Sequence, residues 1–168
     1  IFVNVFQFAW NEMAYLIAGE ENRKEKYNLC VSLLFKTIMF GSGIAFLVSK
    51  ILFPFLIADQ YSEAIGLIPI SIIGVALNSM AGFLGTLFMT EKRTSYILYS
   101  TLISATINIV LGRSFIKIWG LYGGVGALSL SFAVLMIIRL VQLNRKFEIQ
   151  MNIKDIMTVA FLILAIPV

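Results

Sequence analysis

The sequence contains no histidine, a single cysteine (Cys30) and few charged residues. Without histidine, the commonest general base and metal ligand is missing from these 168 residues. One cysteine excludes an internal disulfide and a cysteine-based metal cluster. Charged residues make up 13% of the chain, about half of the roughly 25% that is usual in soluble proteins. We therefore expect no metal site and no cofactor. We also expect that much of the protein surface does not face water.

Long apolar runs take the place of the missing charges. Hydrophobic residues make up 60% of the chain and the mean hydropathy is +0.92. Apolar runs cover residues 38–56, 65–89, 96–111 and 121–140, and about 20 such residues in a helix cross the roughly 30 Å core of a bilayer. Soluble domains do not repeat runs of this length one after another. The pattern predicts a multi-pass membrane protein that contacts membrane lipids.

The short polar segments between these runs set the expected helix boundaries. We expect an all-α polytopic bundle of about five to six transmembrane helices. The expected helices cover residues 1–18, 28–58, 64–89, 96–115, 121–143 and 156–168. Because the last of these is too short to cross a bilayer, we interpret the chain as a piece of a longer protein, with residues 1–168 forming a single transmembrane lobe.

Basic residues are distributed unevenly over the expected turns. One set of alternate turns, with the residues next to them, holds Arg23, Lys24, Lys26, Lys92, Arg93, Arg139, Arg145, Lys146 and Lys154, whereas the other set holds Arg113 and Lys117. The positive-inside rule places the basic side in the cytoplasm. The net charge of +4 fits contact with anionic lipid. Because no basic stripe alternates with exposed aromatic residues, nucleic acid is not an expected partner.

Small and polar residues recur every three or four positions in three of the expected helices, which places them on one helix face. The three sets are Ser71, Gly74, Asn78, Gly82 and Gly85; Ser100, Ser104, Asn108 and Gly112; and Gly120, Gly124, Ala127 and Ser131. Small residues allow the close approach of membrane helices, so packing is one interpretation. The other is that Asn78 and Asn108 line a polar cavity.

The first expected helix carries three amides, Asn4, Gln7 and Asn11, within about 60° of one another on a helical wheel. They indicate either a hydrated helix face or hydrogen bonds to neighbouring helices. Glu12 beside them is either a cavity residue or a residue of the cytoplasmic interface. We retain all four as candidate cavity residues.

Lys36 is the charge that lies deepest in an expected helix, about 14 Å past Tyr27 at 1.5 Å per residue. An unpaired cation near the bilayer centre costs about 2.5–3.5 kcal/mol on insertion scales. Lys36 therefore either extends toward a membrane surface or faces a hydrated cavity that uses its charge. Arg113 lies closer to the outer surface and can extend to it more easily.

Motifs of catalysis are missing. No paired carboxylates, nucleophile elbow or phosphate-binding loop is present. The glycines of residues 120–126 lack the GxGxxG spacing and follow an apolar helix, so we interpret them as packing glycines. We expect no enzymatic activity and no catalytic residues.

Four stretches carry a resemblance to a known family. They are FAWNEMA at 8–14; YSEA at 61–64 with IPI at 68–70; GFLGT at 82–86 with EKRT at 91–94; and INI at 107–109 with WGLYGGVGA at 119–127. In order and spacing, the chain resembles the second half of the bacterial polysaccharide flippases, which export O-antigen and capsule repeat units and belong to the multidrug/oligosaccharidyl-lipid/polysaccharide superfamily. One departure is residues 112–118, which lack the asparagine and proline that many relatives have before the glycine turn.

The resemblance implies a two-lobe transporter in the bacterial cytoplasmic membrane, of which this chain is one lobe. The implied substrate is a lipid-linked oligosaccharide, a short sugar chain on undecaprenyl pyrophosphate, and the implied partners are a polysaccharide polymerase or a chain-length regulator. The candidate cavity residues are Asn4, Gln7, Asn11, Glu12, Lys36, Asn78, Asn108 and Arg113. The alternative is a cation-coupled multidrug antiporter of the same superfamily, which would use Glu12 as its intramembrane acid.

Overall fold

The computed structural model describes residues 2–56 and 65–147, with side chains over 8–53 and 65–145. Over these ranges the chain forms helices α1 (Phe2–Ala18), α2 (Arg23–Leu56), α3 (Ile68–Thr90) and α4 (Thr94–Phe147). Almost every described residue is helical and none lies in a strand, which confirms the all-α prediction. The expected helix at 156–168 lies outside the described residues.

Three helices are long and apolar enough to cross a membrane among the described residues: Arg23–Phe53, Ile65–Thr90 and Thr94–Arg145. The membrane prediction is supported to this extent, whereas the count of five to six helices is not confirmed. The 17 residues of α1 extend over about 25 Å at 1.5 Å per residue, which is shorter than a bilayer core of about 30 Å.

The second helix begins earlier than the sequence indicated. We expected this helix over residues 28–58, but α2 starts at Arg23. The Lys26 amide donates to the Asn22 carbonyl oxygen, which is a helical contact. Arginine, lysine and glutamate are good helix formers, so the charged segment extends the helix instead of interrupting it. The next helix, α3, begins at Ile68 rather than residue 64, and Pro69 falls in its first turn, where no intrahelical donor is needed.

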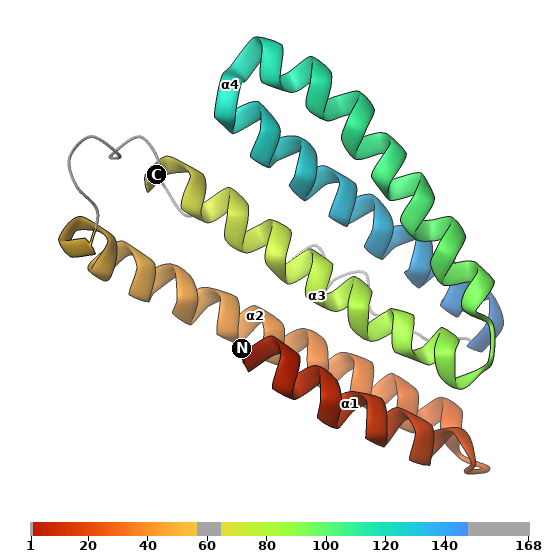
Figure 1. Cartoon of the computed structure of the whole chain (residues 1–168). Helices are drawn as coiled ribbons and strands as arrows, with labels where there is room; N and C mark the ends of the chain where they lie inside the picture. Colours follow the sequence, from red (N-terminus) through yellow and green to blue (C-terminus); the bar gives the residue numbers. More distant parts are fainter. Residues whose placement is uncertain (1, 57–64, 148–168) are drawn as a thin grey trace.

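Helix α4 reverses its direction at Gly120 (Figure 1). Two helices were expected over 96–115 and 121–143 with a turn over 116–120, but helical structure continues through residue 119 and the reversal occurs at one residue. Gly120 has φ 56° and ψ −131°, a conformation that is open essentially only to glycine. Residues 94–119 form a first arm and residues 121–147 a second arm. Ser104 Oγ donates to the Ser131 carbonyl oxygen at 2.7 Å, which joins the two antiparallel arms.

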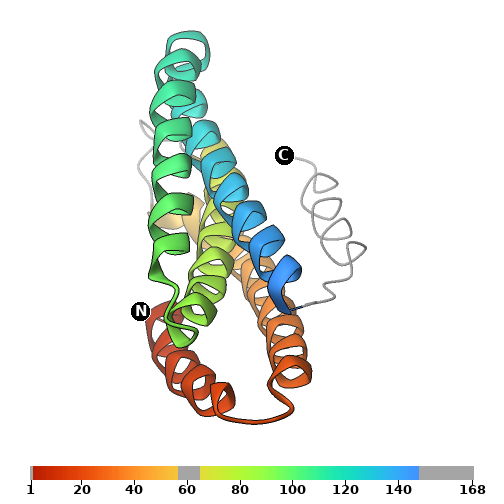
Figure 2. The ribbon, with the colours of Figure 1, turned by 90° about the vertical axis from the view of Figure 1, so that its right-hand side faces the viewer.

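Helix α3 lies in the middle of the structure. Figures 1 and 2 show α1 and α2 on one side of it and the hairpin of α4 on the other. The apolar core forms where these elements meet α3, and it includes Trp10, Tyr27, Val31, Met80, Leu84 and Leu143.

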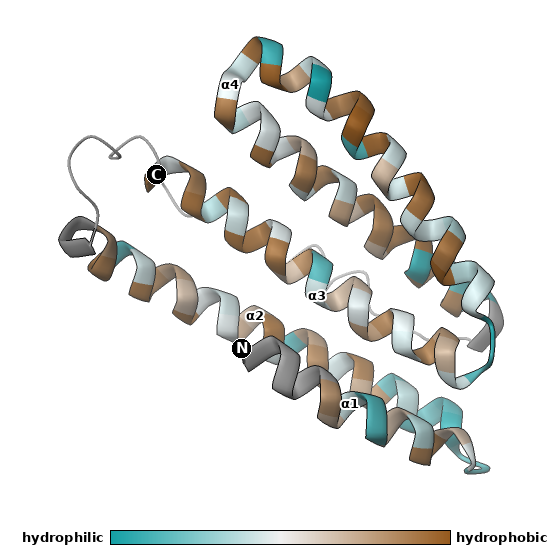
Figure 3. Ribbon diagram, viewed as in Figure 1, coloured by the Kyte–Doolittle hydropathy of each residue, from teal (hydrophilic) through white to brown (hydrophobic). Residues whose placement is uncertain are grey.

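The turns at one end of the bundle are polar, and further hydrophilic positions lie near the reversal of α4 (Figure 3). The α1–α2 turn and the α3–α4 turn lie side by side at the polar end, because Arg23 Nη1 is 3.5 Å from Glu91 Oε1. The C-terminal end of α4, with Arg145, reaches the same end (Figure 1). We call this the basic end, defined by Arg23, Lys24, Lys26, Lys92, Arg93 and Arg145.

Candidate functional site

Two of the candidate cavity residues lie together in α4. Asn108 and Arg113 line one pocket of about 360 Å³ between the two arms. Its other lining residues are Ile109, Gly112, Ile116, Gly124 and Leu128. Gly124 lies close to the first arm, since a Cβ atom there would be 3.4 Å from Ile116 Cγ1. The pocket is thus a cleft of the hairpin itself, and the reversal at Gly120 creates it.

The polar groups of this pocket have no partners among the described residues. Arg113 is exposed and Asn108 is half-buried, and neither forms a hydrogen bond or an ion pair there. Arg113 lies about 10 Å and Asn108 about 18 Å along the helix from Gly120, at 1.5 Å per residue. A guanidinium and an amide can together donate several hydrogen bonds to oxygen atoms. The pocket can therefore bind an oxygen-rich anionic group.

Asn11 has a different role, because its side chain connects two helices. Thr86 Oγ1 donates to Asn11 Oδ1 at 2.7 Å, and Trp10 Nε1 donates to the Phe83 carbonyl oxygen at 3.1 Å. Both bonds connect α1 with α3. Of the two interpretations of this amide, the structure supports hydrogen bonding to a neighbouring helix.

The remaining candidates do not converge on a common site. Glu12, Lys36 and Asn78 are exposed and lie on α1, α2 and α3, respectively. On a helical wheel, Lys36 lies opposite the α2 face that buries Tyr27 and Val31. The side chains of Asn4 and Gln7 lie outside the described part of the structure.

The glycine stripes are explained in part by packing. A Cβ atom at Gly74 would be 2.6 Å from Ser129 Oγ, and one at Gly85 would be 2.9 Å from Arg139 Nη1. At Gly123 a Cβ atom would collide with the Phe115 carbonyl group. The packing interpretation therefore holds for these glycines. Nothing lies within 4 Å of such an atom at Gly112 of the stripes, or at Gly126.

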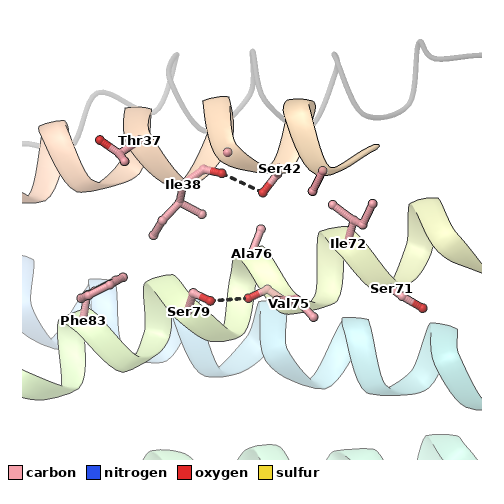
Figure 4. Close-up of a pocket in the computed structure, with 11 residues that line it drawn as sticks. Thr37, Ile38, Ser42, Ser71, Ile72, Val75, Ala76, Ser79 and Phe83 are labelled. Atoms are coloured by element: carbon pink, nitrogen blue, oxygen red, sulfur yellow. Dashed lines mark hydrogen bonds between the residues drawn. The ribbon is translucent and has the colours of Figure 1, made fainter. Parts of the chain in front are cut away.

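A groove between α2 and α3 was not predicted. Its volume is about 620 Å³, and Figure 4 shows Ile38 and Ser42 of α2 facing Ile72 and Ala76 of α3 across it. Although hydroxyl groups line it, Thr37, Ser42 and Ser79 each donate to the carbonyl oxygen four residues earlier in their own helix. With these three donors satisfied internally and Ser71 as the remaining hydroxyl, the lining of the groove is largely apolar. Gly41, Ser42 and Ala45 form a small-residue face of α2 that could have indicated it from the sequence.

Arg139 is the second feature that the sequence analysis missed. We had grouped it with the basic turns, but its side chain is only 6% exposed and it bonds to three neighbours within the bundle. Its acceptors are Ser100 Oγ at 3.1 Å, the Ala81 carbonyl oxygen at 2.5 Å and Thr101 Oγ1 at 3.0 Å. Its position inside the apolar run 121–140 was the available signal, because an intramembrane cation is usually functional or structural.

Comparisons with known proteins add no assignment. No protein family, curated protein or solved structure matches this chain. The resemblance to polysaccharide flippases therefore stays a prediction. Among the described residues, no group of three or more Cys, Asp or Glu side chains is placed to hold a metal ion.

Proposed function

We propose that this chain is part of a transporter that flips undecaprenyl-pyrophosphate-linked oligosaccharide repeat units across the bacterial cytoplasmic membrane for surface polysaccharide synthesis. The observation that carries the proposal is the pocket of α4, where Arg113 and Asn108 lie without partners among the described residues. They line a cleft in a helix that is long and apolar enough to lie in lipid. Arg113 is exposed and Asn108 half-buried, so the N–H donors of both side chains are available to a ligand in the cleft.

The chemistry of this cargo fits the groups that are present. A pyrophosphate accepts charge-assisted hydrogen bonds from a guanidinium, and the hydroxyl groups of a sugar both donate to and accept from an amide. The apolar groove between α2 and α3 offers a separate surface for the hydrocarbon chain of the carrier. In this proposal, the headgroup passes Asn108 and Arg113 while the prenyl chain stays in lipid-facing grooves.

The proposal includes an arrangement for the whole protein. The chain forms one lobe of five to six transmembrane helices, and a second lobe encloses the passage. The basic end lies in the cytoplasm, so the pocket near Gly120 is a site on the outer side. A polysaccharide polymerase or a chain-length regulator would receive the flipped unit.

A cation-coupled multidrug antiporter is the second candidate. The observation in its favour is Glu12, an exposed carboxylate on α1 with no hydrogen bond or ion pair among the described residues. Cationic drugs would, however, be repelled by Arg113 in the pocket of α4. Loss of drug efflux in a Glu12→Gln variant, with normal glycolipid flipping in Arg113→Gln, would favour this candidate over the flippase.

The test is glycolipid flipping in vesicles that contain the full-length protein. A fluorescent undecaprenyl pyrophosphate disaccharide serves as the probe, and dithionite quenching reports the fraction in the outer leaflet. We expect Arg113→Gln to lower the flipping rate about tenfold, because a hydrogen bond to a charged group contributes about 1.5–3 kcal/mol.

The matched control is Lys117→Gln, which removes the same charge one helical turn further along the same arm. Lys117 does not line the pocket, so we expect its variant to flip the probe at the normal rate. Equal rates for Arg113→Gln and the unmodified protein would contradict the proposed site. Absence of flipping by the unmodified protein would contradict the proposed function.

A further inference from the structure

Arg139 joins three helical segments through neutral acceptors. Nη1 donates to the Ala81 carbonyl oxygen of α3, whereas Nε and Nη2 donate to Ser100 Oγ and Thr101 Oγ1 of the first arm of α4. Ser100 is fully buried. Gly85 provides the space for Nη1. The guanidinium is therefore held in place and cannot extend to the membrane surface.

The charge of Arg139 has no counter-ion among the described residues. No carboxylate there pairs with it, and Glu91 at the basic end pairs with Arg23 instead. A guanidinium has five N–H donors, of which the three hydrogen bonds use one each. Two N–H donors therefore remain without an acceptor among the described residues. A buried charge without a counter-ion is strongly unfavourable, so an anion that bound these donors would stabilise the site.

The buried guanidinium comes closest to the surface of the bundle at one of its three acceptor residues. Thr101, which accepts from Nη2, is exposed, and it is flanked by the exposed side chains of Leu98 and Leu102. Thr101 therefore lies on the lipid-facing surface, and we call the side of the guanidinium that donates to it the Thr101 edge. Thr101 lies about 10 Å along the helix from Thr94, the first residue of α4 at the basic end, at 1.5 Å per residue.

We propose that Arg139 binds the phosphate group of an anionic membrane lipid at the Thr101 edge. Phosphate oxygens accept from a guanidinium in the bidentate geometry that two free N–H groups allow. Lipid headgroups are drawn toward intramembrane arginines by local thinning of the bilayer. Such a lipid would hold α3 and both arms of α4 together, whatever cargo the protein carries.

The test measures lipid binding by the full-length protein in detergent, with native mass spectrometry and phosphatidylglycerol as the probe. We expect Arg139→Gln to weaken the tightest phosphatidylglycerol site about tenfold or more, as expected for the loss of hydrogen bonds to a charged group. The matched control is Arg93→Gln, which removes one charge from the exposed turn at the same end and should change this affinity less than twofold. Phosphatidylcholine of the same chain length should not occupy the site.

A second variant keeps the test valid if Arg139→Gln does not fold. Thr101→Val removes the hydroxyl that accepts from Nη2 on the exposed side of the site. We expect it to weaken phosphatidylglycerol binding while the protein stays folded, because Nη2 is then no longer held at that edge. Equal affinities for Thr101→Val, Arg93→Gln and the unmodified protein would overturn the proposal. Stabilisation by inorganic phosphate, equal to that by phosphatidylglycerol and lost in Arg139→Gln, would also overturn it, by assigning the site to a free anion.

Discussion

Similar polar residues of this chain lie in three different environments. Asn11 accepts a hydrogen bond from a neighbouring helix, Asn108 lines a pocket without a described partner, and Asn78 is exposed. All three amides lie in apolar helices, so the sequence assigned them to one class of candidates. What separates them is the identity of the facing helix, which a single-helix pattern does not contain.

At the scale of the residue, we predict that Asn11 and Thr86 are energetically coupled. Asn11→Leu and Thr86→Val should each lower the free energy of unfolding. The loss in the double variant should be smaller than the sum of the two single losses by about 0.6 kcal/mol. Reversible unfolding by steric trapping in bicelles measures these free energies. Additive effects, with loss of transport in Asn11→Leu alone, would instead place Asn11 at the cargo.

At the scale of the element, the reversal of α4 depends on close contact between its arms. Gly123 is buried and its Cα lies against the backbone of Phe115. Phe115 and Trp119 pack edge to face near the turn, with ring centroids 5.0 Å apart. The chain therefore reverses at residue 120 without a separate loop. Arg113 lies about two helical turns from the reversal and Asn108 about three.

We predict that Gly120→Ala destabilises the protein by about 1–3 kcal/mol, because alanine is strained at this backbone conformation. The matched control is Gly126→Ala in the second arm, where an added Cβ meets nothing within 4 Å and φ is not positive. That variant should be neutral or more stable by up to about 1 kcal/mol, because alanine is the better helix former. Comparable destabilisation of both variants, measured by the same unfolding method, would mean that the turn does not require glycine.

At the scale of the whole molecule, the charge asymmetry has a structural basis. The α1–α2 turn, the α3–α4 turn and the end of α4 all lie at the basic end, and Arg23 and Glu91 connect two of them. Arg113 and Lys117 lie toward Gly120 at the opposite end. The folded bundle thus has one polar end that is rich in cations, which is the arrangement that the positive-inside rule describes.

We predict that the basic end faces the cytoplasm. In a Cys30→Ala background, Trp119→Cys should react with a membrane-impermeant maleimide in intact cells, whereas Glu21→Cys and Lys92→Cys should react only after the membrane is opened. All three positions are exposed in the structure. Labelling of Glu21→Cys in intact cells, with Trp119→Cys protected, would reverse the orientation and place the pocket of α4 on the inner side.

The sequence by itself determined the helical class, the membrane environment and the alternation of charge. These properties follow from composition and local periodicity, which act within one segment at a time. Only the tertiary structure decided that the hairpin of α4 brings Asn108 and Arg113 into one pocket, that Asn11 bonds to α3, and that Arg139 is buried among hydroxyl and carbonyl oxygens. The reason is that an amide or a cation in one helix finds its hydrogen-bond partners on helices that are distant in the chain. How closely two helices approach depends on small residues such as glycine where they meet, and not on the amide or the cation.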